Sequence, residues 1–204
     1  TKGSLTEIPF PLPPIKTQQA IVSKIEELFS ELDKGIEDLK TAQQQLKTYR
    51  QSVLKWAFEG KLTNENVKDG ELPKGWEIVN IGKICKCIVP NRDKPKSFSG
   101  DIKWVTTPNL KPNSIKLEYE NIGSGLSESE VIEYNARVIP LGGVIMTCVG
   151  NFGLAAIVEK PIVINQQLHA FISNDVIIPK YIAYNIQFNK HYFEKKSTST
   201  TIQY

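Results

Sequence analysis

The sequence has few cysteines and no long apolar run. Its three cysteines, Cys85, Cys87 and Cys148, are odd in number, and the first two are too close together to bridge easily. We therefore expect reduced thiols rather than the disulfide framework of a small secreted domain. No apolar run approaches the roughly 20 residues that span a bilayer, and the opening residues lack the apolar stretch of a signal peptide. These absences predict a cytoplasmic protein.

Motifs for bound metals and cofactors are also missing from the 204 residues. No cysteine and histidine residues stand at zinc spacing, and no segment carries a dinucleotide or methyl-donor fingerprint. The stretch "GNFG", residues 150–153, lacks the Lys-Ser/Thr pair of a P-loop, so it predicts a hairpin turn instead. Cys148 and His169 lie in apolar, strand-like runs where packing explains them. We expect no metal site and no catalytic residue. An enzyme that uses Cys148 as its nucleophile is the least favoured hypothesis for the function of this chain.

Charge is unevenly distributed, although the formal net charge of +3 does not by itself indicate a partner. The segment 83–116 holds eight basic residues and only two acidic ones, whereas the segment 118–133 holds five acidic residues and no basic one. This segregation favours one face for a polyanion and a second face turned away from it. Charges that are scattered by loop geometry are the alternative interpretation.

A long heptad pattern dominates the first third of the chain. Thr17 is a candidate N-cap and Gly60 a candidate stop, so we expect a helix from about residue 17 to residue 58, roughly 60 Å long at 1.5 Å per residue. Such a rod cannot cover its own apolar stripe, so it must lie against another helix in this chain or another. The alternative is two shorter helices that are broken at Gly35. The predicted helix–helix interface is a 4-3 alternation with two small residues: Ile21, Ile25, Leu28, Leu32, Gly35, Leu39, Ala42, Leu46, Tyr49, Val53 and Trp56.

The remainder of the chain predicts a compact, sheet-rich, mixed α/β domain behind a linker. The polar stretch "TNENVKDGELPKGW" contains glycine and proline and is typical of a linker. The short runs "IKWVTT", "GVIMTCV", "AAIVE" and "PIVIN" favour strands. Ser127 and Glu130 form a capping-box pattern for one short helix, and Pro179 predicts the start of another with Ile182, Ile186, Asn189 and Phe193 on one stripe. The fold class is therefore α+β.

Two polar stretches are candidates for a nucleic-acid contact. In "VPNRDKPKSFSGDIKWVTTPNLKPNS", basic side chains alternate with Thr, Asn and Ser, and "KKSTSTTIQ" near the end has the same character. Lysines would position phosphates, while Thr and Asn would read base edges. A solvated loop would also be polar, so composition leaves both interpretations open. The candidate DNA-binding residues are Lys94, Lys96, Lys103, Thr106, Thr107, Asn109 and Lys111, with a second arm of Lys195, Lys196, Ser197 and Thr198.

The order of these motifs resembles the specificity subunit of type I restriction-modification enzymes. The stretch from "IPFPLPPIKTQQ" to "SVLKWAFEGKLT" looks like that family's proline-rich entry into a long spacer helix, although Thr17 stands where the family usually has an acidic residue. "LPKGWEIVNIGKI" is similar to the phrase that opens each target recognition domain. "DIKWVTTPNL", "LGGVIMTCVGNFGLAAIV" and "INQQL" then follow in the family's order.

The resemblance implies a domain plan with half of the usual architecture. Residues 1–14 would be an extended tail like the end of a preceding recognition domain, 15–62 the spacer helix, 63–75 a linker and 76–204 the target recognition domain. The C-terminal "STSTTIQY" resembles what normally precedes the N-terminal "TKGSLTEIPFPLPP", as if the chain were cut from a repeating circle. The prolines would hold the exit from one recognition domain extended, and the helix would fix the distance to the next.

The resemblance also implies function and partners. We expect a non-catalytic subunit that recognises half of a split site in double-stranded DNA and docks methyltransferase subunits and a restriction subunit. No cofactor is expected in this chain, because the family binds the methyl donor and ATP on partner subunits. The long helix would pair with a second specificity half or with a second copy in a homodimer. The alternative hypothesis is a coiled-coil interaction scaffold without DNA specificity.

Overall fold

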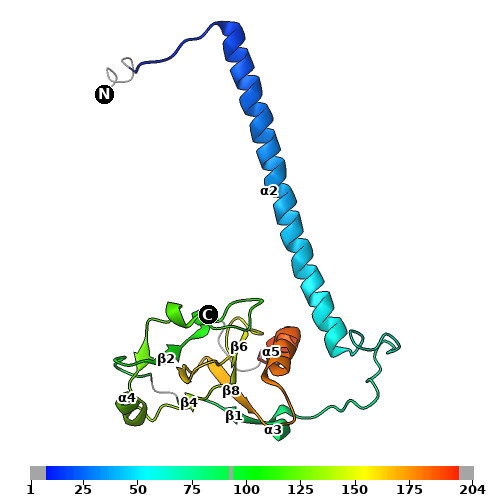
Figure 1. Ribbon diagram of the computed structural model, residues 1–204, viewed down its shortest axis with the longest axis vertical. Helices are drawn as coiled ribbons and strands as arrows, with labels where there is room; N and C mark the ends of the chain where they lie inside the picture. Colours follow the sequence, from blue (N-terminus) through cyan, green and yellow to red (C-terminus); the bar gives the residue numbers. More distant parts are fainter. Residues whose placement is uncertain (1–7, 92–93, 198–204) are drawn as a thin grey trace. The chain divides into compact units, whose positions relative to one another are not determined.

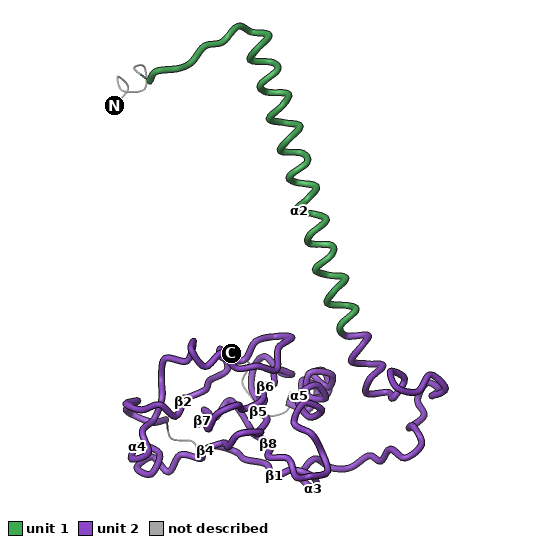
Figure 2. The backbone as a smooth tube through the Cα atoms, in the orientation of Figure 1, with its two compact units in different colours: residues 1–50 green, residues 51–204 purple. Residues whose placement is uncertain are grey.

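The computed structural model describes residues 8–91 and 94–197. Its backbone contacts divide the chain into two units, residues 1–50 and residues 51–204 (Figure 2). The elements in chain order, labelled as in Figure 1, are α2 (Ile15–Phe58), α3 (Ile81–Ile84), β1 (Cys85–Ile88), β2 (Ile102–Val105), η1 (Thr107–Asn109), η2 (Tyr119–Asn121), β3 (Gly125–Leu126), α4 (Glu128–Glu133), β4 (Val138–Ile139), β5 (Val144–Thr147), β6 (Ala155–Ile157), β7 (Ile162–Ile164), β8 (Leu168–Ser173), α5 (Pro179–Phe188) and α6 (Lys190–Ser197).

Helix α2 is a single unbroken helix of 44 residues. The prediction of a long helix is confirmed, and the alternative of a break at Gly35 is wrong, because one glycine costs too little to interrupt so long a hydrogen-bond ladder. The helix begins at Ile15, so Thr17 is not its N-cap. The amide nitrogens of Thr17 and Gln18 both donate to the carbonyl of Pro14, at 2.8 and 3.1 Å. Pro14 therefore closes the first turn.

Large apolar side chains of α2 remain exposed along its length. Leu32, Leu39 and Leu46 are each 60% or more exposed. Val22, Phe29 and Ile36 are exposed as well, one position beyond the predicted row. Ile36 widens the stripe beside Gly35, where the predicted row carries no side chain. The stripe on the N-terminal half of the helix is therefore broader than a strict 4-3 seam.

The last turns of α2 belong to the second unit and are packed there. The ring of Phe58 stacks on Phe188 at 5.3 Å between centroids and meets Tyr181 edge-on at 5.1 Å. Lys61 then forms ion pairs with Glu59, at 3.0 Å, and with Asp69. These ion pairs hold part of the predicted linker close to the residues that follow the helix.

Two four-stranded sheets form the body of the second unit. The first has the order β1-β8-β5-β6 with every pair antiparallel. The second has the order β3-β2-β7-β4, and its β2–β7 pair is parallel. Sheet strands that are adjacent in space are therefore often distant in sequence. The prediction of a mixed α/β, sheet-rich domain after the long helix is confirmed.

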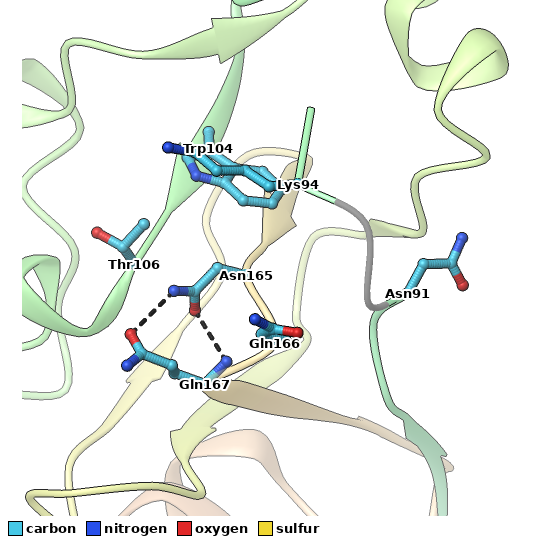
Figure 3. A pocket seen from close by; sticks show the side chains of 7 residues that line it. All are labelled: Asn91, Lys94, Trp104, Thr106, Asn165, Gln166 and Gln167. Carbon is cyan, nitrogen blue, oxygen red and sulfur yellow. Dashed lines mark hydrogen bonds between the residues drawn. The ribbon is translucent and has the colours of Figure 1, made fainter. Parts of the chain in front are cut away.

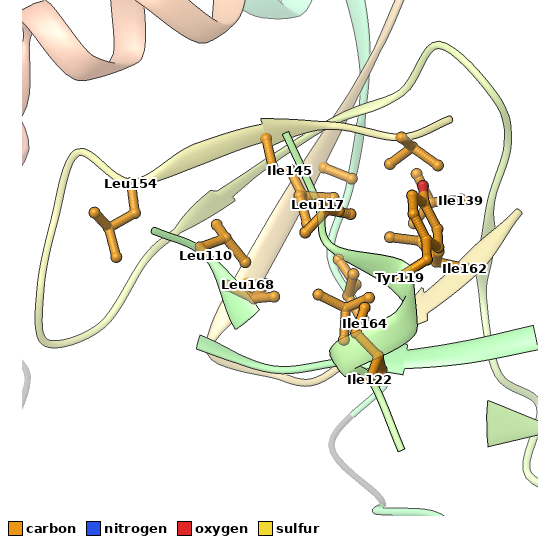
Figure 4. Close-up of a cluster of buried hydrophobic side chains, with 14 residues drawn as sticks. Leu110, Leu117, Tyr119, Ile122, Ile139, Ile145, Leu154, Ile162, Ile164 and Leu168 are labelled. Carbon is orange, nitrogen blue, oxygen red and sulfur yellow. The ribbon is translucent and has the colours of Figure 1, made fainter. Parts of the chain in front are cut away.

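Two apolar clusters fill the domain. The larger gathers residues from both sheets and from the 110–122 segment, and Ile139, Ile162 and Leu168 in it are fully buried (Figure 4). The smaller lies under α5 and joins Ile182 and Ile186 to Val144 of β5. β5 and β7, which have a strand on each side in their sheets, are buried at every residue, as strands that are covered on both faces require.

The short helices follow their sequence signals with one exception. Ser127 caps α4 and Glu130 closes the predicted capping box. Pro179 is the first residue of α5, as predicted. The single stripe expected from Ile182 to Phe193 is wrong, because the helix ends at Phe188 with Asn189 as its C-cap and α6 begins at Lys190. None of the helices in the described ranges is apolar over enough residues to traverse a bilayer.

Candidate nucleic-acid interface

The parallel pairing of β2 with β7 brings two polar segments to one edge of a sheet. Val105 is in register with Ile164, and Asn165 donates its amide to the carbonyl of Val105 at 3.0 Å. Both strands end at this point, so Thr106 and Asn165 begin neighbouring loops. About 60 residues of sequence separate these loops, yet they form one polar surface.

A pocket of about 320 Å³ opens at this edge. Figure 3 shows the indole of Trp104 forming one wall, with amide side chains opposite. We call it the amide pocket, and it is lined by Asn91, Lys94, Trp104, Thr106, Asn165, Gln166 and Gln167. A cation, a flat aromatic surface and several carboxamides thus share one open cavity.

Hydrogen bonds fix two of the three adjacent carboxamides. Asn165 donates through Nδ2 to Oε1 of Gln167 at 3.0 Å, and its Oδ1 accepts from the amide of Gln167 at 3.2 Å. Thr107 Oγ1 lies 3.4 Å from the same Gln167 oxygen. The side chains of this pocket wall are therefore held in place by hydrogen bonds to one another. Polar groups that are already fixed lose little conformational entropy when a ligand binds.

The turn after β2 is held by Asn109. Its Oδ1 accepts from the amide of Thr106 at 2.8 Å and from the Thr106 hydroxyl at 3.0 Å. This pattern closes a capping box around η1. Asn109 therefore orients the turn, and only its amide nitrogen is left for a base contact.

A second, smaller pocket adjoins the amide pocket and shares Asn91 and Trp104 with it. It is also lined by Tyr134 and Arg137. Arg137 is exposed and supplies a cation to this second pocket. Each of the two pockets thus combines the Trp104 side chain with one cation, Lys94 or Arg137.

Glu130 holds the basic loop that carries Lys94. Its Oε2 accepts from the amides of Ser99, at 3.0 Å, and Ser127, at 2.8 Å. Hydrogen bonds from the Ser97 hydroxyl and then from the Ser127 and Ser99 amides lower the pKa of this carboxyl from 4.5 to about 2. The carboxylate therefore joins the start of α4 to the loop before β2.

The acidic segment and the basic segment meet in the structure. Glu130 contacts the loop of residues 97–99, and Glu118 forms an ion pair with Lys111. The expectation of a basic face and an acidic face turned away from it is wrong at Lys111 and Glu118, whose opposite charges attract each other, and at Glu130, whose carboxylate accepts hydrogen bonds from neutral serines of the basic segment. The Lys111 ammonium is already engaged by a carboxylate.

The other predicted DNA-binding residues do not line the amide pocket. Lys96 is exposed on the same loop, and Lys103 is half-buried on β2. Lys195 and Lys196 lie in the last turn of α6, where Ser197 Oγ donates to the Glu194 carbonyl at 2.9 Å. Thr198 lies outside the described residues. A role for these side chains stays a prediction.

Comparison with known proteins identifies the family. Residues 73–204, about two thirds of the chain, match the model of the type I restriction modification DNA specificity domain. The chain belongs to this family. The resemblance noted in the sequence is confirmed.

The relatives of this specificity domain are longer proteins. The type I restriction enzyme MjaIX specificity subunit of Methanocaldococcus jannaschii is 29% identical over 138 residues, which are 65% of this chain and 31% of the relative. The EcoBI specificity subunit of Escherichia coli is 26% identical over 180 residues, 79% of this chain and 37% of the relative. The chain thus spans about a third of the curated relatives it matches.

Solved structures support the fold. A chain from a study of complex assembly and conformational transition of the type I R-M system matches with a TM-score of 0.59 at 19% identity, covering 91% of this chain and 44% of that one. The HsdS subunit from Thermoanaerobacter tengcongensis matches with a TM-score of 0.52 at 18% identity, covering 92% and 44%. A long helix followed by a mixed α/β domain is therefore a known arrangement.

Cys148 and His169 of the specificity domain lack the features of a nucleophile pair. Burial raises the pKa of the Cys148 thiol and lowers that of the His169 imidazole. Both shifts favour the neutral forms over the thiolate and imidazolium of an activated pair. Cys148 Sγ lies 3.6 Å from the carbonyl oxygen of Gln166, which makes it part of the loop packing.

Several residues that line the two pockets are not among the predicted DNA-binding residues. Asn91 and Trp104 lie inside the basic stretch from which the candidates come, and composition alone does not distinguish them from their neighbours. The amides of 165–167 were noted only as part of "INQQL". Three adjacent carboxamides directly after a buried strand were the available signal. Arg137 gave no signal, since it stands alone in the sequence.

Proposed function

We propose that this chain is a DNA-reading specificity subunit of a type I restriction-modification complex. Its domain recognises half of a split site in double-stranded DNA, and its long helix docks methyltransferase subunits. The chain itself catalyses no reaction, and the methyl donor and ATP bind to the methyltransferase and restriction subunits. The amide pocket carries this proposal, because it places Lys94, a hydrogen-bonding wall and an aromatic surface in one open cavity.

The chemistry of the pocket suits a nucleic acid. Lysine and arginine neutralise phosphates and give affinity that does not depend on sequence. Carboxamides and hydroxyls recognise donors and acceptors on base edges in the major groove. Lys94 and Arg137 provide the first kind of contact, and the amide pocket provides the second.

Selection from random DNA tests the proposal. The chain is purified together with its methyltransferase subunits, and duplexes with randomised positions are selected by binding. We expect a split motif to be enriched. If no duplex is preferred over random DNA, the alternative of a coiled-coil scaffold without DNA specificity replaces this proposal.

A further inference from the structure

Gln166 stands at the tip of a rigid turn between β7 and β8. The turn is closed by a hydrogen bond from the amide of Leu168 to the carbonyl of Asn165, at 3.0 Å. The amide of Cys148, in the next loop, donates to the carbonyl of Gln167 at 3.0 Å. The backbone of this turn is thus fixed on both sides of Gln166.

The side chain of Gln166 differs from its neighbours. The Asn165 carboxamide donates to Oε1 of Gln167 and accepts from the Gln167 backbone amide, as the dashed lines in Figure 3 show. The carboxamide of Gln166 makes no hydrogen bond to any residue in the described ranges. Gln166 is exposed and lines the amide pocket. A donor and an acceptor are therefore displayed together from a fixed backbone and are free to bind a ligand.

A carboxamide with both groups free has a preferred partner among the bases. Its oxygen accepts from the adenine N6 amino group while its nitrogen donates to adenine N7, which makes two bonds in the major groove. Guanine presents two acceptors at the same edge and cannot satisfy the oxygen. The neighbouring indole of Trp104 offers an apolar surface, which suits the methyl group of the thymine in an A·T pair.

We propose that Gln166 reads an adenine of an A·T pair in the DNA site, with Asn165 and Gln167 positioning it. This proposal rests on the proposed function, because it requires that the domain binds duplex DNA in a sequence-dependent way. Lys94 lines the same pocket and would hold a phosphate beside that base pair. Gln166 was not among the residues predicted from the sequence.

The experiment compares motifs selected by four proteins. The chain and its methyltransferase subunits are used with the unchanged sequence, with Gln166→Ala, with Gln166→Glu, and with Asn66→Ala as a control that removes an exposed carboxamide outside both α2 and the amide pocket. Each complex selects from the same randomised duplexes. Circular dichroism confirms that each variant is folded, and the nearly isosteric Gln166→Glu remains informative if the alanine variant does not fold.

The expected change is confined to one base pair of the half-site. Gln166→Ala should lose discrimination for adenine at that position by roughly 5- to 150-fold, the value of one bidentate contact, with the other positions unchanged. Gln166→Glu carries only acceptors and should shift the preference there towards cytosine. Asn66→Ala should select the original motif.

Other results overturn the proposal in distinguishable ways. If Gln166→Ala weakens binding equally to all sequences, the Gln166 side chain contacts the sugar-phosphate backbone of the DNA and not a base. If neither Gln166 variant changes the motif, Gln166 does not read DNA although the domain does. If the unchanged complex selects no motif, the proposed function itself fails.

Discussion

At the scale of single residues, the predicted lysines differ in what surrounds them. Lys94 lines the amide pocket, whereas Lys111 is paired with Glu118. An ammonium that is already paired with a carboxylate gains less from a phosphate, because the existing pair must be broken. We therefore expect Lys94 to dominate the phosphate contacts of this loop.

Replacing Lys94 by alanine tests this expectation. The change removes one charge from the pocket, so binding should weaken for all sequences alike, and the slope of log K against log salt should become shallower by about 0.9 for one lost phosphate contact. Affinities measured at several salt concentrations give the slope. Lys180→Ala, at an exposed position of α5, is the control and should leave the slope unchanged. An unchanged slope for Lys94→Ala would remove Lys94 from the interface.

Glu130 makes stability depend on pH in a defined window. Its pKa in the folded protein is about 2, below the ordinary 4.5, so the ionised form is favoured by folding. A depressed carboxyl pKa contributes stability that is fully present above about pH 4.5 and is lost as the pH falls towards 2. Glu130→Gln should be less stable than the parent at pH 7, and the difference should shrink between pH 4.5 and 2.

Denaturant unfolding at a series of pH values measures this difference. Other carboxylates titrate in the same range, since the pKa values of Asp69 and Glu118 are also lowered by their lysine partners. The comparison of parent and variant removes their contribution. Glu128→Gln, at an exposed position in the first turn of the same helix, is the control and should show no such convergence. A constant difference across the window would contradict the assigned role of Glu130.

At the scale of elements, the β5–β6 loop depends on two glycines for different reasons. Both Gly150 and Gly153 have positive φ, at +76° and +80°. A β-carbon at Gly150 would meet nothing within 4 Å, whereas one at Gly153 would lie 2.7 Å from Cβ of Lys190 in α6. Gly153 therefore also permits the close approach of α6 to the hairpin.

Alanine substitutions separate these two requirements. Gly150→Ala should cost about 1 kcal/mol of unfolding free energy, from the left-handed backbone alone. Gly153→Ala should cost about 1–3 kcal/mol more, because α6 must shift or the core is strained. Denaturant unfolding of both variants measures the difference. Equal losses would show that α6 does not press on this loop.

The sequence predicted the secondary-structure elements better than it predicted which elements pair with one another in the fold. Local patterns sufficed for α2, for the capping box of α4 and for the strands around "GNFG". These elements depend on hydrophobic periodicity, helix-capping residues and turn residues, which are all local in sequence. The amide pocket depends on the parallel pairing of β2 with β7, which joins residues about 60 positions apart. No local pattern encodes that register. The break at Asn189 was missed because the apolar period continues through it.

At the scale of the whole molecule, we propose that the apolar stripe of α2 binds a partner. Each large apolar side chain gains roughly 1.5–3 kcal/mol when it is fully buried. Leu28, Leu32 and Leu39 are 49–73% exposed, and other stripe residues on both sides of them are exposed as well. In the complete family architecture a second spacer helix would cover the stripe, so a second copy of this chain is the substitute we propose.

Two copies that are paired through α2 about a two-fold axis would carry two identical readers. Identical half-sites in opposite orientation make a palindrome, so the selected DNA motif should be palindromic and split. Any change in base preference, such as that proposed for Gln166→Glu, should then appear in both halves of the motif. A motif that changes in one half only would indicate a different second reader.

Charges placed in the stripe test the pairing directly. Sedimentation at micromolar concentration should show a dimer, and Leu32→Glu with Leu39→Glu should dissociate or unfold it, because two carboxylates would have to be buried against apolar side chains. Ser30→Glu with Gln44→Glu adds the same charge on the opposite face of α2 and should remain dimeric. A soluble, well-folded monomer of the unchanged chain would contradict the homodimer. The stripe would then be a surface on which the methyltransferase subunits, and not a second copy, have to bind.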